Sequence, residues 1–175
     1  YDDLIAALAT LPATLHWRMD HIGGGTLSAA LQQQARQAGI DDRVTWHGAQ
    51  PQEMVLEACR ASDIFVLASR IAKDGDRDGL PNVLMEAQSQ GLPCIATKVS
   101  AIPELITDGE TGVLVEAEDR PALSRALEGL ITDPARRKTL GQAGQARVRG
   151  EFSHEFWIER LAGMFGLPYS AGEAA

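Results

Sequence analysis

Residues 63–97 read DIFVLASRIAKDGDRDGLPNVLMEAQSQGLPCIAT, and the pattern within this stretch decides the fold. Residues 63–68 and 93–97 are short apolar runs, which are typical of strands buried on both faces of a parallel sheet. Residues 81–90 fit a helix, because Pro81 suits its first turn and Gly91 its end. A strand, a long loop, a helix and a second strand make the unit from which parallel sheets are built.

The same alternation of strands and helices continues on both sides of this unit. The further segments are expected as helices at 2–9, 26–38, 51–61, 102–106, 119–131, 133–149 and 153–165, and as strands at 15–22, 43–47 and 112–115. This rhythm predicts an α/β fold with a Rossmann-like, doubly wound parallel sheet. Such sheets ordinarily open on a strand, whereas this chain opens on a helix, so we expect the sheet to lack its first strand.

The composition is that of one globular domain. The chain has 175 residues, of which 45% are hydrophobic and 23% charged, enough for a single core. A net charge of -8 argues against a nucleic-acid partner. Cys59 and Cys94 are too few for a disulfide scaffold, which indicates a reducing compartment. With no signal peptide and no apolar run of about 20 residues, we expect a cytoplasmic protein.

Three glycines follow the expected strand at 15–22, in the sequence HIGGGTL of residues 21–27. Glycines at such a turn let a ligand approach the backbone, and the next helix turns its free N–H groups toward that ligand. A dinucleotide-binding fingerprint is excluded because its third glycine would fall at Ser28, and a P-loop because no Gly-Lys-Ser/Thr follows. A tight structural turn explains these glycines about twice as well as a ligand loop does.

The segment before the helix, residues 69–80, is longer than the ~2–6 residues that usually join a strand to a helix. It contains Asp74, Asp76 and Asp78 at alternate positions. An EF-hand counted from Asp74 would need its last carboxylate where the chain has Met85, so we reject a calcium loop. A manganese-binding Asp-x-Asp pair finds no support elsewhere in the sequence.

Two carboxylates bracket the start of the expected helix. Asp78 lies just before it, and Glu86 about a turn and a half inside it. The N–H groups of Gly79 and Leu80 and the positive end of the helix suit a phosphate. Glu86 could accept hydrogen bonds from a ribose diol, and Asp78 from sugar hydroxyls, which together suit a sugar nucleotide. An N-cap-like role for Asp78 and a solvated position for Glu86 explain the two residues equally well.

The sequence around this pair resembles a known family. DGLPNVLMEAQSQGLPCIATKVSAIPELITDGETGVLVEAED, residues 78–119, is similar to the signature of the retaining glycosyltransferases of family 4, the group 1 family with the GT-B fold. The Glu-x7-Glu motif of that family corresponds to Asp78 and Glu86. The resemblance covers about residues 1–165, and DGDRDGLP at 74–81 is most similar to enzymes of colanic-acid-type exopolysaccharide biosynthesis.

Two upstream segments carry the same resemblance. Residues 21–27 resemble the glycine loop of the family, and RVTWHGAQP at 43–51 resembles its next strand and turn. The resemblance implies the C-terminal half of a GT-B fold, with a nucleotide-sugar-binding domain at 1–167 that the helices at 119–165 close. Residues 168–175 would be a frayed tail. The N-terminal acceptor domain of the family would lie outside this sequence.

The resemblance also implies a role for each matching residue. Glu86 would bind the ribose hydroxyls and Asp78 would contact the donor sugar, which makes them the expected catalytic pair. The other implied donor-binding residues are Gly23 and Gly25 near the donor, His47, Gly48 and Ala49 beside the base, Gly79, Leu80, Pro81 and Asn82 along the diphosphate and sugar, and Leu84 beside the ribose or base. No metal or other cofactor is expected, because this fold stabilises the leaving diphosphate with basic side chains and helix N–H groups.

Two features depart from the pattern of the family. The first acidic position is Asp78 rather than Glu, one methylene shorter, which bears on the contact with the sugar. The Arg and Lys that the family usually places on the diphosphate have no match. Lys73, Arg77 and Lys98 are candidate substitutes, although a solvated surface charge explains each of them more simply.

The function implied is that of the donor-binding domain of a retaining glycosyltransferase. The parent enzyme would transfer a hexose from a nucleotide-diphosphate sugar to a saccharide or a polyprenyl-linked saccharide, held by the N-terminal domain. It would associate peripherally with the inner face of the membrane, and the present chain alone would be inactive. A sugar-nucleotide epimerase with the GT-B fold and a non-catalytic nucleotide-binding module are the alternatives.

Overall fold

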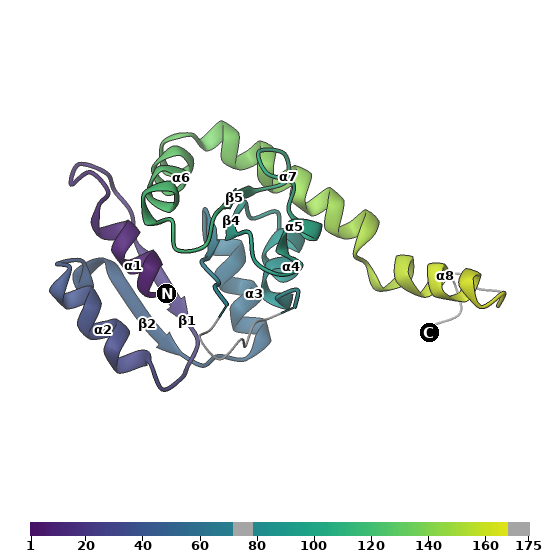
Figure 1. Cartoon of the computed structure of the whole chain (residues 1–175), viewed down its shortest axis with the longest axis horizontal. Helices are drawn as coiled ribbons and strands as arrows, with labels where there is room; N and C mark the ends of the chain where they lie inside the picture. Colours follow the sequence, from purple (N-terminus) through teal and green to yellow (C-terminus); the bar gives the residue numbers. More distant parts are fainter. Residues whose placement is uncertain (72–78, 168–175) are drawn as a thin grey trace.

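Helices and strands alternate along the chain in a computed structural model that describes residues 1–71 and 79–167 (Figure 1). The helices are α1 (Asp2–Ala9), α2 (Ser28–Gln37), the 3-10 helix η1 (Asp41–Arg43), α3 (Gln52–Ala61), α4 (Asn82–Ser89), α5 (Ile102–Leu105), α6 (Arg120–Thr132), α7 (Pro134–Glu151) and α8 (His154–Met164). The strands are β1 (Met19–Ile22), β2 (Val44–Gly48), β3 (Phe65–Leu67), β4 (Cys94–Thr97) and β5 (Val113–Val115). Each expected helix and strand is present, although β1 begins at Met19 rather than at residue 15.

The strands are parallel, and they form two sheets. β1 pairs with β2, with Met19 opposite Val44. The second sheet has the order β3-β4-β5, with Phe65 opposite Cys94 and Ile95 opposite Val113. The expected α/β class with parallel strands is therefore confirmed. Among the described residues β1 and β3 are not paired, so the parallel strands are divided between the two sheets.

Helices cover both faces of the β3-β4-β5 sheet. Ile95 of β4 packs in one hydrophobic cluster with α1 and α6, whereas its neighbours Cys94 and Ala96 pack in another with α4 and α5. This division follows from the geometry of a strand, in which successive side chains point to opposite faces. The layers are therefore helix, sheet and helix. All four residues of β4 are buried, as expected for a central strand of such a sheet.

The strand at residues 63–68 differs from its expected burial. Phe65, Val66 and Leu67 are each half-buried, so the expectation of a strand buried on both faces is wrong for β3. Both β3 and β4 have apolar sequences, but β3 lies at one side of its sheet and β4 at the centre. A continuous apolar sequence indicates contact with other layers and does not say whether a strand has a neighbour on each edge.

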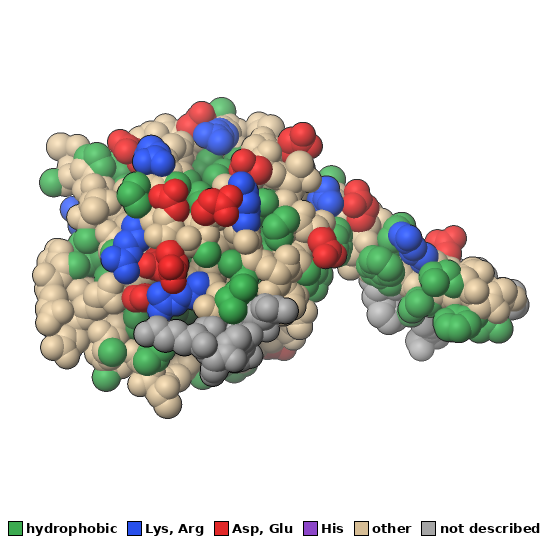
Figure 2. All heavy atoms as spheres, viewed as in Figure 1, with side chains coloured by type: hydrophobic (Ala, Val, Ile, Leu, Met, Phe, Trp, Pro, Cys, Tyr) green, Lys and Arg blue, Asp and Glu red, His purple; other side chains and the backbone are tan. Residues whose placement is uncertain are grey.

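The last helix extends away from the body of the molecule. α8 follows α7 and projects beyond the sheets and their helices (Figure 1). Its side chains Trp157 and Leu161 are exposed, as is Phe165 just after it. Figure 2 shows hydrophobic side chains gathered at this projecting end of the molecule. Among the residues that the structure describes, no helix combines the length and the apolar character needed to cross a membrane.

Candidate functional site

The loops after β1 and β2 are joined by a backbone hydrogen bond. The N–H of Gly23 donates to the carbonyl of Gly48 at 2.8 Å, and Gly24 lies against Ala49. Gly23, Gly25 and Gly48 have φ angles of +154°, +148° and +68°, which glycine adopts far more readily than other residues. The predicted residues of these two loops therefore share one surface at the carboxyl ends of β1 and β2.

His47 is held at this surface by a residue that the sequence analysis did not select. Its Nε2 lies 2.6 Å from Oδ1 of Asp20, which belongs to the neighbouring strand β1. The carbonyl of His47 also accepts a hydrogen bond from Nε2 of Gln50 at 2.7 Å. Both partners of the first contact are exposed, so the ring is oriented while its surroundings stay open to solvent. The partner comes from the pairing of β1 with β2, which no local pattern reveals.

The start of α4 is open to solvent on one side. Pro81 precedes the helix in an extended conformation, with φ -65° and ψ 119°, and it is buried. Gly79 and Asn82 on either side of Leu80-Pro81 are exposed, while Leu80 packs against the core. The carbonyl of Gly79 accepts a hydrogen bond from the N–H of Ala101 at 3.3 Å. A proline has no side-chain acceptor for the first helical N–H groups, so this end retains the partial positive charge that attracts an anion.

Glu86 belongs to α4, and its side chain contacts α3. Its Oε1 accepts a hydrogen bond from Nε2 of Gln52, the first residue of α3, at 2.7 Å. Burial raises the pKa of the nearby Cys59 thiol on α3, and the charge of Glu86 raises it further. Glu86 therefore faces α3, and Gln52 links it to the segment that follows Gly48 and Ala49. Gln52 could not be identified from the sequence, because only the packing of α3 against α4 brings it to Glu86.

One expected ligand contact does not fit the structure. Leu84 was expected to pack beside the ribose or base, but its exposed fraction is 0%. It belongs to the hydrophobic cluster that also holds Ala87 and Leu105. The expectation for Leu84 is wrong, because on α4 this position faces the sheet while Glu86, two residues later, faces α3. The role of Leu84 is to pack α4 onto the sheet.

Several candidate residues lie outside the described ranges. Asp78, the first carboxylate of the expected pair, is one of them, as are Lys73 and Arg77 among the possible diphosphate partners. The third, Lys98, is described, and its Nζ lies 2.9 Å from Oε1 of Glu116. That contact is exposed, which agrees with a surface ion pair.

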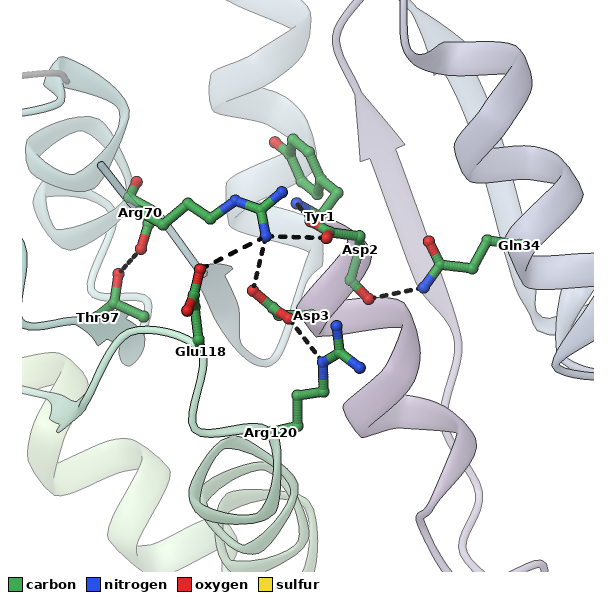
Figure 3. A network of polar contacts seen from close by, with 9 residues as sticks. Tyr1, Asp2, Asp3, Gln34, Arg70, Thr97, Glu118 and Arg120 are labelled. Carbon is green, nitrogen blue, oxygen red and sulfur yellow. Dashed lines mark hydrogen bonds and ion pairs between the residues drawn. The ribbon is translucent and has the colours of Figure 1, made fainter. Parts of the chain in front are cut away.

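A basic residue that is not among the sequence-based candidates lies after β3. Figure 3 shows Arg70 among carboxylates at the start of α1 and after β5. Its Nη1 lies 3.0 Å from Asp2, 3.6 Å from Asp3 and 3.9 Å from Glu118. Asp3 is buried and also accepts a hydrogen bond from Nε of Arg120 at 2.7 Å. The charge of Arg70 is thus balanced within the protein, and the network ties α1 to the loops after β3 and β5.

The same network sets the charge state of Asp2. Partial burial works to raise the pKa of its carboxyl, but the Arg70 guanidinium, the α-amino group and hydrogen bonds outweigh this and lower the pKa. The carbonyl of Asp2 accepts a hydrogen bond from Nε2 of Gln34 at 2.8 Å, which adds α2 to the contact (Figure 3). The start of α1 is therefore held by Arg70, Arg120 and Gln34, which belong to three other segments of the chain.

Comparison with known protein sequences gives a consistent result. The family model described as glycosyl transferases group 1 matches residues 1–147. The amylovoran biosynthesis glycosyltransferase AmsK of Erwinia amylovora is 36% identical over 141 residues, which are 81% of this chain and 35% of that protein. The putative colanic acid biosynthesis glycosyltransferase WcaL of Salmonella typhimurium is 35% identical over 106 residues, 61% of this chain and 26% of that protein. The chain thus spans about a third or less of the length of these relatives.

Solved structures share the fold. The C-terminal domain of a glycosyl transferase group 1 family protein, LpcC of Francisella tularensis, has a TM-score of 0.72 and 29% identity, over 87% of this chain and 77% of that one. HepE of Anabaena, solved in complex with UDP, has a TM-score of 0.81 and 22% identity, over 94% of this chain and 44% of that one. These matches confirm the expected fold, which is the C-terminal half of a GT-B glycosyltransferase.

Proposed function

The chain belongs to the group 1 family of glycosyl transferases, and on that basis we propose that it is the part of a hexosyltransferase that binds a nucleotide-diphosphate sugar. The parent enzyme transfers the hexose with retention of the anomeric configuration. Amylovoran and colanic acid enzymes among the relatives support a role in polysaccharide biosynthesis. HepE, which shares the fold, was solved in complex with UDP, and this supports a nucleoside diphosphate as the donor carrier.

The contact between Gln52 and Glu86 is the observation that carries this proposal. It holds a carboxylate beside the exposed start of α4, on the side of α3 and of the loop after β2. A carboxylate has about four acceptor sites on its two oxygens, and Gln52 occupies one of them. The remaining sites of Glu86 accept the two hydroxyl groups of a ribose.

The other residues complete the donor site around that ribose. The base lies along the loops of Gly23 and His47, and the diphosphate lies at the N–H groups that begin α4. Asp78 contacts the transferred sugar. The leaving diphosphate is stabilised by helix N–H groups and basic side chains, without a resident metal.

The acceptor is a saccharide, free or carried on a polyprenyl lipid, and it is held by an N-terminal domain of the parent enzyme. We propose that the parent enzyme works in the cytoplasm, at the inner face of the membrane. The present residues supply donor capture, and transfer itself requires the acceptor domain.

Calorimetric titration of the chain with UDP, GDP and their hexose conjugates tests the donor site. Glu86→Ala removes the ribose contact and should weaken the preferred nucleotide at least tenfold, since hydrogen bonds to a charged group contribute about 1.5–3 kcal/mol. Glu53→Ala is the matched control, because it removes the same charge from an exposed position of neighbouring α3. The 2′-deoxy nucleotide should bind the unsubstituted chain more weakly than the nucleotide itself does. Its affinity should fall little further when Glu86 is replaced by alanine.

Two results would contradict the proposal. One is the absence of binding to any of these nucleotides by the folded chain. The other is an equal loss of nucleotide affinity with Glu86→Ala and Glu53→Ala, which would show that Glu86 is only a surface residue of its helix.

A further inference from the structure

A pair of polar side chains joins β1 to β2 close to the loops of the candidate donor site. Nε2 of His47 lies 2.6 Å from Oδ1 of Asp20, and both side chains are exposed. An ionised carboxylate only accepts hydrogen bonds, so a neutral imidazole must carry its proton on Nε2 and donate it to Asp20. The other ring nitrogen, Nδ1, then has no proton and is an acceptor. Asp20 therefore determines which tautomer His47 adopts.

The register of the two strands sets His47 apart from its neighbours. His21 of β1 lies opposite Trp46, and Ile22 lies opposite Gly48. His47 is therefore an extra residue in β2, without a partner in β1. An extra residue of this kind is a β-bulge, and bulges commonly re-aim a side chain next to a binding site.

The pair lies on the side of the sheets that α3 and α4 cover. Trp46 packs against the hydrophobic cluster of α1 and α6, as does Val66 of β3. Leu67, the next residue of β3, packs in the other cluster, which contains residues of α3 and α4. The ring of His21 lies 4.9 Å from that of Trp46, on the first side. Because side chains alternate along a strand, Asp20 points to the second side.

A short stretch of chain connects His47 to Glu86. Five residues after His47, Nε2 of Gln52 donates to Oε1 of Glu86 at 2.7 Å. Five residues span at most about 18 Å, and the loop of Gly48 and Ala49 lies within this stretch. A ribose held by Glu86 would therefore place its base along this loop, where the base meets the exposed ring of His47.

We propose that Nδ1 of His47 accepts a hydrogen bond from the ring N–H of a uracil or guanine base, and that Asp20 is the positioning residue that keeps Nδ1 free of a proton. Adenine and cytosine carry a lone pair at the corresponding ring position, which would face the lone pair of Nδ1. This mismatch disfavours them as well as leaving Nδ1 without a donor. The inference rests on the proposed function and names the class of base that the donor carries.

N-methylated nucleotides isolate this one contact. The full chain is titrated by calorimetry with UDP and 3-methyl-UDP and with GDP and 1-methyl-GDP, at about pH 8, above the ordinary pKa of histidine. In each methylated nucleotide the ring N–H is replaced by a methyl group. For the base that binds better, methylation should weaken binding at least about tenfold. In His47→Phe, which keeps a flat ring without an acceptor, methylation should weaken binding less than about threefold.

Asp20→Asn tests the positioning role. An amide can either accept from Nε2 or donate to it, so both tautomers become available and the effect of methylation should fall at least about threefold. Asp42→Asn is the matched control, because it removes the same charge at an exposed position of η1, at the opposite end of β2. Nitrogen-15 NMR of the His47 ring gives a second measurement. The proton should lie on Nε2 in the unsubstituted chain and should be shared between both nitrogens in Asp20→Asn.

Three results overturn the inference. The first is an equal effect of methylation in the unsubstituted chain and in His47→Phe. The second is an NMR spectrum that places the proton on Nδ1 in the unsubstituted chain. Nucleotide binding that depends on Glu86 would leave the donor proposal standing in both cases. The third is the absence of binding to any of these nucleotides by the folded chain, which overturns the donor proposal as well.

Discussion

The side-chain amide of Gln52 lies 2.7 Å from the carboxylate of Glu86 and joins the first residue of α3 to the middle of α4. α3 directly follows the loop that contains Gly48 and Ala49, so this contact links the two halves of the proposed donor site. Gln52 thereby positions Glu86, because it holds one oxygen of the carboxylate and leaves the other for the proposed ribose contact.

Gln52→Ala should weaken nucleotide binding about fivefold, since a hydrogen bond to a charged group contributes about 1.5–3 kcal/mol and water replaces part of it. Calorimetry with the nucleotide that binds best gives the measurement. The matched control is Gln33→Ala, at an exposed position of α2.

A double-mutant cycle separates positioning from a general loss of structure. In the Glu86→Ala background, Gln52→Ala should have almost no further effect on the dissociation constant, because its partner is gone. Additive losses would show that Gln52 acts on the ligand or on the fold by another route.

The close packing of α7 against the segment after α4 gives a second prediction, this time on stability. A Cβ at Gly141 would lie 2.0 Å from the carbonyl oxygen of Gly91, a backbone atom that cannot rotate away. Gly141→Ala should therefore reduce the free energy of unfolding by about 3 kcal/mol. Urea denaturation followed by circular dichroism measures this change.

Gly150 in the same helix provides the control. A Cβ there has open space around it, so Gly150→Ala should stabilise the protein by about 0.5–1 kcal/mol through the higher helix propensity of alanine. Equal effects of the two substitutions would contradict the close approach of α7 to Gly91.

Much of the fold follows from local sequence patterns. The apolar runs at 63–68 and 93–97, and the prolines and glycines that begin and end the helices, were enough to place the strands and helices. Glu86 could be selected because its spacing from the start of a helix is a local property. The sequence could not reveal that β3 lies at one side of its sheet, because an apolar run is the same whether a strand has one neighbour or two.

Contacts between distant segments account for what the sequence analysis missed in the candidate site. Asp20 meets His47 only because β1 pairs with β2, and Gln52 meets Glu86 only because α3 packs on α4. Leu84 was assigned to the ligand because it lies within the motif, but the rotation of α4 turns it into the core. The missed residues are polar and have no periodic pattern, so strand pairing and helix packing are needed to identify them.

The environment of His21 predicts a dependence of stability on pH. His21 is buried, with the ring of Tyr1 at 4.5 Å and the ring of Trp46 at 4.9 Å between centroids. Burial disfavours the charged imidazolium and lowers the pKa of His21 below its ordinary value of 6.5. As the pH falls through 6.5, the unfolded chain therefore takes up a proton at this site before the folded chain does.

The contribution of His21 to stability is consequently complete above pH 6.5 and is lost progressively as the pH falls toward the lower pKa of the folded state. Urea unfolding at a series of pH values between about 7.5 and 5 should show this decline. His21→Gln should reduce the slope of stability against pH in that window, whereas His16→Gln, at an exposed position, should leave it unchanged. If His21→Gln retained the full slope, the decline would arise from other groups, and the burial of a neutral imidazole between Tyr1 and Trp46 would not be its cause.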